Sequence, residues 1–340
     1  MNTTARNISV CLAVLISLSS CGCAADQTEN SYAGSVYAMD TVMTIRINGS
    51  AAESHFHAAE STLHRLEDMW SVTDESSELY KLNSLGSATV SAETVELISF
   101  ALETGESTNG ALDITLYPVV REWGFTTGEY AIPDTARLRE LLHSRGTPEI
   151  NGNSITLPQG TQLDLGAVAK GCAGDILCGE LKAAGVTSAL LDLGGNIHAI
   201  GGREDGSDWR LGLQHPRGNG SIAVIELNDK AAVTSGDYER YFTDENGRRY
   251  CHIIDPKTGF PADNGLCSVT VIGEHGKLCD ALSTALFVMG AQQAEEYWKK
   301  NNDFGMILIT TEGDMLITED ISQEVSPTES FTGQLTILTK

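Results

Sequence analysis

The feature that most constrains the fold of this chain is that its strand-like segments gather in runs between long helical segments. Between residues 188 and 272, short apolar and β-branched segments follow one another with no long helical pattern between them. Segments with apolar residues at helical spacing stand before and after this region. Parallel sheets need a regular alternation of strand and helix, so this order predicts an α+β fold with a mainly antiparallel sheet.

The periodicity also predicts the individual elements. Strands are expected at 35–47, 154–157, 162–165, 188–193, 197–201, 209–213, 222–227, 231–235, 249–254, 267–272 and 305–310, and helices at 51–69, 91–107, 135–145, 167–184, 279–289 and 291–300. No Pro- or Ser-rich linker divides the body, and no internal repeat is present. Residues 35–340 are therefore expected to form a single two-lobed domain with packed helices.

The first twenty residues have the pattern of a secretory signal. A start with one Arg is followed by an apolar run from Ile8 to Leu18, which is too short to span a bilayer. Leu18-Ser19-Ser20-Cys21 resembles a bacterial lipobox, with Cys23 as a weaker candidate; an ordinary cleaved signal with an incidental cysteine is the alternative. We expect a signal peptide at 1–20, lipidation of Cys21 and a flexible tether at 21–34. The protein would then be exported and lipid-anchored to the outer face of the cell membrane, or to the periplasmic side of a membrane.

The charge balance narrows the possible ligands. The 340 residues include 22 Lys and Arg against 46 Asp and Glu, a formal net charge of −24. Nucleic-acid binding depends on clustered basic residues, and none of the charged stretches is basic, so no nucleic-acid partner is expected. The same acidity repels a phosphate-bearing small molecule, which would need local donors or a bound cation. The cysteines form no CxxC pair, and most are expected to be buried small apolar side chains.

Three segments carry residues suited to ligand binding. Residues 111–115 place Asp113 and a threonine close to Trp123, which fits either a ligand cleft or an Asx turn beside a packed ring. Residues 163–171 run from a strand through Asp164 into a helix with Lys170 near its start, which favours an anion; a plain helix start is the alternative. The paired glycines of 192–196 either let backbone approach a ligand or make a tight turn.

Two later segments carry residues suited to catalysis. His252 ends an expected strand in a polar setting, where a neutral imidazole accepts a proton near pH 7, although isolated histidines are more often structural. Asp280 and Thr284 are four residues apart on an expected helix, with Ser283 beside them. A carboxylate and hydroxyls are hard oxygen ligands suited to Mg²⁺. Taken alone, this last segment also fits a helix cap.

In this order the segments resemble the bacterial FAD:protein FMN transferases, the ApbE family. The resemblance extends from about Met39 to Thr310. Four motifs carry it: SEL at 77–79 with LN at 82–83, DLGAVAKG at 164–171, LGGN at 193–196, and HIIDP at 252–256 with TG at 258–259.

The resemblance implies an enzyme that binds FAD, cleaves its pyrophosphate and joins FMN through a phosphoester to a Thr or Ser of an exported or membrane protein, with release of AMP. The acceptor would be a flavoprotein subunit or FMN-binding domain of a membrane electron-transfer system. By matching position, the implied FAD contacts are Met39, Ala111, Leu112, Asp113, Asp164, Lys170 and Ile254, with Thr73 at a further flavin position. The implied Mg²⁺ ligands are the carbonyl of Ala167 with Asp280, Ser283 and Thr284, and His252 is the implied base.

The chain departs from the family pattern at three positions. Asp40 stands where the family often has Gly, and Cys251 where it often has a second His. Thr73 stands where many members place a Tyr over the flavin, and the missing ring removes about 1 kcal/mol of stacking. Some relatives without this Tyr hydrolyse FAD to FMN and AMP. An FAD pyrophosphatase and a non-catalytic FAD-binding lipoprotein therefore remain as alternatives.

Overall fold

The computed structural model describes residues 31–340. The expected signal peptide and Cys21 lie outside the described residues, as does most of the expected tether. The first strand begins at Ser31, inside the segment expected to be tether.

The described residues confirm the α+β class and the mainly antiparallel sheet. The largest sheet has nine strands in the order β1-β2-β6-β7-β10-β13-β14-β15-β17, and only β15 and β17 pair in parallel. These strands are β1 Ser31–Ala38, β2 Thr41–Asn48, β6 Ser188–Asp192, β7 Asn196–Ile200, β10 Ala231–Gly236, β13 Leu266–Gly273, β14 Phe304–Thr310, β15 Met315–Thr318 and β17 Leu335–Leu338.

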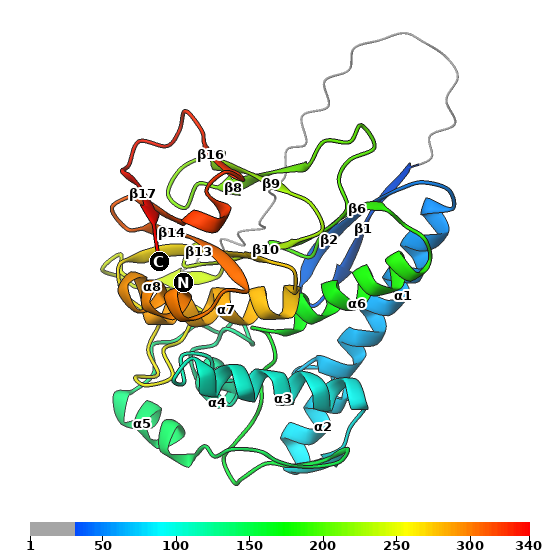
Figure 1. Cartoon of the computed structure of the whole chain (residues 1–340). Coiled ribbons are helices and arrows are strands. Elements are labelled where there is room, and N and C mark those ends of the chain that lie inside the picture. The colour runs from blue at the N-terminus through cyan, green and yellow to red at the C-terminus, as the bar shows by residue number, and fades with distance from the viewer. Residues whose placement is uncertain (1–30) are drawn as a thin grey trace, which may run out of the picture.

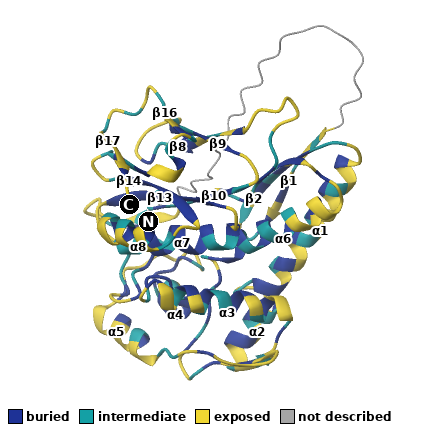
Figure 2. Cartoon of the chain, in the orientation of Figure 1, coloured by how far each residue is buried: buried dark blue, intermediate teal, exposed yellow. Residues whose placement is uncertain are grey.

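Helices cover one face of this sheet and a smaller sheet covers part of the other (Figure 1). The covering helices are α1 Ala52–Trp70, α6 Ala169–Ala183, α7 Gly276–Met289 and α8 Ala291–Lys300, and the smaller sheet has β16 Val325–Pro327, β9 Ser221–Leu227 and β8 Trp209–Gln214. Strand β13 is buried along its whole length between these layers, and Figure 2 shows the buried residues concentrated there and in α7. Val271 packs with residues of α7 and α8, whereas Ile272 packs with residues of the smaller sheet.

A second lobe lies below α6 and α7 in Figure 1. It contains α2 Glu78–Leu85, α3 Ala92–Ser107, α4 Tyr117–Glu122 and α5 Thr135–Ser144, with a small sheet of β3 Ser87–Thr89, β5 Ser154–Thr156 and β4 Glu149–Asn151. A hairpin of β11 Tyr241–Thr243 and β12 Arg249–Cys251 carries Phe242 and Tyr250 into the aromatic cluster of this lobe.

Several helices form where the sequence predicts them. The apolar residues of α1 that are buried recur three or four positions apart, as an amphipathic helix requires. Helix α3 begins after Ser91, whose hydroxyl accepts the backbone N–H of Thr94 at 3.2 Å. The described cysteines are all free: Cys251, Cys267 and Cys279 are buried, and Cys172 and Cys178 are half-buried.

The single strand expected at 35–47 is wrong, because the chain forms a hairpin there. Strands β1 and β2 are joined at Met39 and Asp40, which have φ of 49° and 59°. Two consecutive left-handed residues suit the twist of a two-residue hairpin, and Asp tolerates this region better than most residues. The turn has no glycine to mark it in the sequence, and the alternation of apolar and polar residues continues through it, so one strand was predicted in place of two.

Two other expected strands are wrong or too long. At 162–165 only Gln162 makes a β-bridge. The Asn83 side chain takes the place of a neighbouring strand at Leu163: its Oδ1 accepts the Leu163 N–H at 2.7 Å, and its Nδ2 donates to the Leu163 carbonyl oxygen at 2.8 Å. The strand expected at 249–254 stops at Cys251. Helix α7 begins at Gly276, three residues before its expected start, so Asp280 lies in its second turn and not in its first.

Helices α6 and α7 cross at glycines. A Cβ at Gly171 would lie 2.3 Å from the carbonyl oxygen of Gly276 and 2.6 Å from Cβ of Asp280. No side chain fits in this contact, so glycine at this position permits the close approach. The crossing brings Lys170 on α6 beside Asp280 on α7, whose charges interact.

We expect Gly171→Ala to lower the free energy of unfolding by about 1–3 kcal/mol or more, since the added methyl group forces the two helices apart. Gly179→Ala is the matched control in the same helix. Nothing lies within 4 Å of a Cβ there, so this change should raise stability by about 0.5–1 kcal/mol. Urea denaturation of both variants measures the difference. Equal effects of the two substitutions would contradict the proposed role of the crossing.

Candidate active site

A small cavity of about 60 Å³ lies where α6, α7, β7 and β10 meet. It is lined by Gly166, Lys170, Gly194, Gly195, Asn196, Val233, Thr234, Ser235, Glu239, His252, Asp280 and Thr284. Four of the five segments that the sequence analysis selected therefore contribute residues to one cavity.

Asp280 is the buried acid of the cavity, with 7% of its surface exposed. Its Oδ2 accepts the backbone N–H of Gly171 at 2.8 Å. Burial raises the pKa of Asp280 to about 6, while the Gly171 N–H and the Lys170 ammonium act in the opposite direction. One backbone donor at the start of α6 is therefore already committed to a carboxylate.

Three hydroxyls continue from Asp280 toward the sheet. Ser283 Oγ lies 2.9 Å from the carbonyl oxygen of Asp280, to which it donates. Ser235 Oγ lies 2.8 Å from Ser283 Oγ and 3.3 Å from Thr284 Oγ1. Since Ser283 donates to the helix carbonyl, Ser235 donates to Ser283 and keeps its lone pairs for Thr284 or a ligand. Ser283 is fully buried and does not line the cavity. Its role there is to accept the hydrogen bond that orients Ser235, which does line the cavity.

Glu239 is a second acid that the sequence analysis did not select. It follows β10 and lines the cavity. Burial raises its pKa to about 7; the charges of Lys170 and Arg240 oppose this rise, and the negative charge of Asp280 adds to it. Its sequence signal was weak because the segment 234–242 contains many polar residues and no recognised spacing singles out one of them.

His252 lines the cavity, and one of its ring nitrogens has no hydrogen-bond partner among residues 31–340. Its backbone N–H donates to the carbonyl oxygen of Arg240 at 3.0 Å, and its Nδ1 lies 3.2 Å from the same oxygen. A carbonyl oxygen only accepts, so Nδ1 carries the proton and Nε2 is left as an acceptor. Burial, together with the charges of Arg240 and Lys170, lowers the pKa of His252 to about 4, and the bond to the Arg240 carbonyl opposes this fall. The imidazole is therefore neutral at pH 7.

Two of the expected FAD contacts lie beside the cavity without lining it. Asp164 Oδ1 accepts the N–H of Gly166, and burial raises the pKa of this carboxyl while the Arg240 charge lowers it. The turn that contains Met39 reaches the same arginine, because Arg240 Nη2 donates to the carbonyl oxygen of Asp40 at 3.4 Å. Arg240 thus interacts with three parts of the site: it donates to the hairpin turn, its charge acts on Asp164, and its carbonyl oxygen bonds His252.

The other expected FAD contacts lie in the second lobe. Ala111, Leu112 and Ile254 are buried in hydrophobic clusters. Asp113 forms an ion pair with Arg145. Thr73 is exposed in the connection after α1.

These second-lobe residues do not line the small cavity, but their segments are connected to it. The backbone N–H of Asp164 donates to the carbonyl oxygen of Ile114 at 2.8 Å. On the other side of the lobe, the Tyr117 hydroxyl donates to the carbonyl oxygen of Val72 at 3.3 Å, next to Thr73. The segment 111–117 therefore spans the distance between Thr73 and the cavity.

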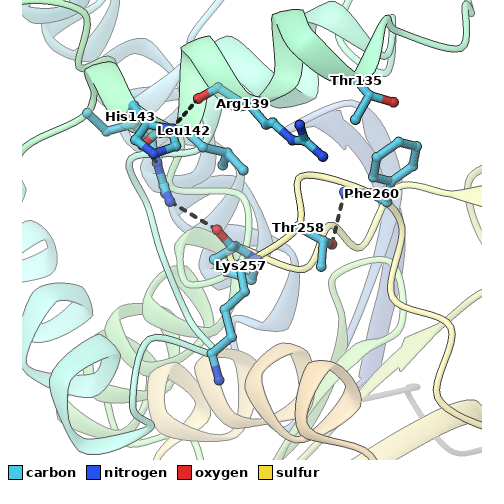
Figure 3. Close-up of a pocket in the computed structure, with 9 residues that line it drawn as sticks. Thr135, Arg139, Leu142, His143, Lys257, Thr258 and Phe260 are labelled. Carbon is cyan, nitrogen blue, oxygen red and sulfur yellow. Dashed lines mark hydrogen bonds between the residues drawn. The ribbon is translucent and has the colours of Figure 1, made fainter.

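A larger cavity of about 580 Å³ lies between α5 and the loop that follows β12. It is lined by Thr135, Arg139, Leu142, His143, Arg145, Pro256, Lys257, Thr258 and Phe260, and Figure 3 shows the side chains of α5 facing this loop. None of the residues expected to bind the metal ion or move a proton lines it. We therefore place the candidate active site at the smaller cavity.

The smaller cavity fits a cation that binds hard oxygen ligands. Within residues 31–340, no group of three or more His, Cys, Asp or Glu side chains is arranged to hold a metal ion. A cation here would depend on one carboxylate, that of Asp280, with hydroxyl and carbonyl oxygens and the oxygens of a phosphate ligand. Mg²⁺ is commonly bound in this way, through one or two carboxylates and substrate phosphates.

Comparison with known proteins decides the family. A family model described as the ApbE family matches residues 39–308. The chain belongs to the ApbE family. The resemblance read from the motifs is thereby confirmed.

Relatives and solved structures of ApbE proteins agree with this assignment. The chain is 34% identical to the FAD:protein FMN transferase of Treponema pallidum over 314 residues, which cover 84% of this chain and 86% of the relative. It is 32% identical to that of Klebsiella pneumoniae over 278 residues, which cover 79% and 86%. The crystal structure of the ApbE protein from Thermotoga maritima superposes with a TM-score of 0.81 at 31% identity, covering 86% of this chain and 99% of the other. The fold is confirmed as that of ApbE proteins.

The raised pKa of Asp280 predicts a pH-dependent cost of burying this group. Because the folded-state pKa of about 6 lies above the ordinary value of 3.8, the metal-free protein loses stability as the pH rises through this interval. Asp280→Asn removes the charge and keeps the shape. We expect this variant to match the wild type near pH 4 and to be more stable by about 2–3 kcal/mol above pH 7, in EDTA. A stability difference between the two proteins that does not change with pH would contradict the assigned pKa.

Proposed function

We propose that this protein transfers FMN from FAD to a Thr or Ser hydroxyl of an exported or membrane electron-transfer protein, in a Mg²⁺-dependent reaction that releases AMP. The observation that carries the proposal is one cavity that combines Lys170, the Asp280–Thr284 pair and a histidine with a free Nε2. The relatives support the reaction, since they are FAD:protein FMN transferases.

The chain must bind a pyrophosphate despite its net charge of −24. Lys170 supplies a local positive charge at the start of α6. The carbonyl oxygen of Ala167, with Asp280 and Thr284, would hold Mg²⁺, and Ser283 would support this set through Ser235. When bound, Mg²⁺ supplies the positive charge that stabilises the phosphoryl oxygens as the pyrophosphate bond breaks.

His252 would move the proton of the acceptor. Its Nε2 takes the proton from the Thr or Ser hydroxyl, while its Nδ1–H remains bonded to the Arg240 carbonyl and keeps the ring in place. The acceptor oxygen forms a bond to the phosphorus of the FMN half, and the bond from that phosphorus to the bridging oxygen breaks. AMP leaves with the bridging oxygen.

Two alternatives rest on specific residues. With Thr73 in place of a ring, the flavin would be held less firmly, and water would replace the acceptor hydroxyl in an FAD pyrophosphatase. A non-catalytic FAD-binding lipoprotein would have no use for the Asp280–Thr284 pair or for the free nitrogen of His252.

We also propose that the protein is exported and anchored to a membrane through a lipid on Cys21. The support for this location is the pattern of residues 1–21 in the sequence. In the part of the chain that the structure describes, none of the helices combines the length and apolar character needed to span a bilayer.

Transfer predicts a covalent product. Incubation of the protein with FAD, Mg²⁺ and an FMN-binding acceptor domain should add the mass of FMN less one water to the acceptor and release one AMP per adduct, as followed by intact-mass spectrometry and chromatography. Asp280→Ala should abolish both products while the fold is kept, because the carboxylate that holds the cation is lost. AMP and free FMN without adduct would favour the pyrophosphatase, and full activity of Asp280→Ala in EDTA would contradict the metal site.

His252→Ala should reduce transfer by about 100-fold or more while FAD affinity changes little, because the imidazole acts on the acceptor and not on the flavin. Glu239→Gln is the matched control, since it removes the acid of the cavity whose pKa burial raises to about 7 and keeps its shape. Single-turnover rates and FAD titrations measure the two effects. Loss of transfer only in Glu239→Gln would assign the base to Glu239.

A further inference from the structure

We propose that Asn196, held in one orientation by His198, is a positioning residue that fixes the Asp280 carboxylate for cation binding. The inference rests on the proposed function in one respect, namely that Asp280 holds the cation. It adds two residues from β7 that no motif of the sequence analysis assigned to metal binding.

The side-chain amide of Asn196 is buried, and only its oxygen has a hydrogen-bond partner among the described residues. Its side chain is 2% exposed and lines the cavity together with Asp280. Its Oδ1 lies 2.8 Å from Nε2 of His198, whereas its Nδ2 has no hydrogen-bond partner among the described residues. The same amide lies close enough to Asp280 to favour the ionised carboxylate. Buried donors are nearly always paired, so an unpaired one that faces a cavity indicates a role there.

His198 determines which way this amide points. Since Asn196 Oδ1 only accepts, the hydrogen bond requires the proton on Nε2 of His198. A rotated amide would turn Nδ2 toward the imidazole and place Oδ1 against the negative carboxylate of Asp280. The hydrogen bond from His198 therefore keeps the donor side of Asn196 on the Asp280 side.

The imidazole itself is clamped between the two helices that form the site. A Cβ at Gly174 of α6 would lie 1.9 Å from Nε2 of His198, and one at Gly276 of α7 would lie 2.0 Å from its Cε1. The ring is 2% exposed. Both helices thus have a glycine where the imidazole packs, and a side chain at either position would collide with the ring.

Asp280 thus accepts one hydrogen bond from α6 and lies near a second donor on β7. The Gly171 N–H of α6 reaches Oδ2, and the Asn196 amide approaches from β7. Two donors on different elements would restrict the orientation of this carboxylate, which lines the cavity. Groups that orient a metal ligand typically change metal affinity by 10- to 100-fold when they are removed.

The test uses the full chain and Mn²⁺ alone as a probe, with free Mn²⁺ measured by electron paramagnetic resonance in the absence of FAD. We expect Asn196→Ala and His198→Leu to weaken Mn²⁺ binding by about 10- to 100-fold. His198→Gln is the matched control, because its amide N–H can still donate to Asn196 Oδ1, and it should retain most of the affinity. In transfer assays, excess Mg²⁺ should restore the rate of Asn196→Ala.

Thermal unfolding of each variant separates positioning from a purely structural role. A structural role alone would lower the melting temperature of His198→Leu and leave the Mn²⁺ affinity of the folded protein unchanged, and that result would overturn the inference. Wild-type Mn²⁺ affinity in Asn196→Ala, with loss of affinity in Asp280→Ala, would overturn it and leave the proposed function standing. Unchanged affinity in Asp280→Ala would instead contradict the metal site on which both depend.

Discussion

The close crossing of α6 and α7 is the contact on which the rest of the site depends. Gly171 lets the two helices approach until its backbone N–H reaches the carboxylate of Asp280 at 2.8 Å. This contact places the only strongly basic side chain of the cavity, Lys170, next to its most buried acid. A larger residue at position 171 would separate the start of α6 from the face of α7 that carries Asp280 and Thr284, which we propose act together on a phosphate and a cation. The large sheet packs against α7 at this crossing, and β13, which lies under the helix, is buried along its whole length.

The electrostatics of the cavity are unfavourable without a ligand. Burial raises the pKa values of both Asp280 and Glu239, and the Lys170 charge opposes both rises. The negative charge of Asp280 adds to the rise at Glu239, and that of Asp175 adds to the rise at Asp280. Two acids in a small space gain free energy when a divalent cation enters, and the cation in turn attracts a pyrophosphate. In the proposed mechanism, the strongly acidic protein would bind a dianionic group through one lysine and one cation. The positions of Asp280 and Lys170 therefore matter more to binding than the net charge of the chain.

Local patterns in the sequence predicted much of this fold, and the failures have physical causes. The helix at 91–107 was predictable because its cap and apolar stripe are local. The turn at Asp40 was missed because a non-glycine residue takes a left-handed φ there. A strand was wrongly predicted at 162–165, where the Asn83 side chain and not a neighbouring strand bonds the backbone of Leu163. Asp280, Thr284, Lys170 and His252 were found from their motifs and do meet in one cavity. Glu239 and His198 were missed because their importance comes from burial and from contacts across the fold, which spacing along the chain does not encode.

The central claim is that the cavity at the α6–α7 crossing binds a divalent cation through Asp280. Crystals soaked with Mn²⁺ and FAD test it most directly, because anomalous scattering locates the ion without reference to any assumed ligand. The account predicts a single strong peak in this cavity, within bonding distance of a carboxylate oxygen of Asp280, with a phosphate of FAD as its neighbour. A peak elsewhere, with Asp280 still bonded only to Gly171 while FAD is bound, would contradict the account.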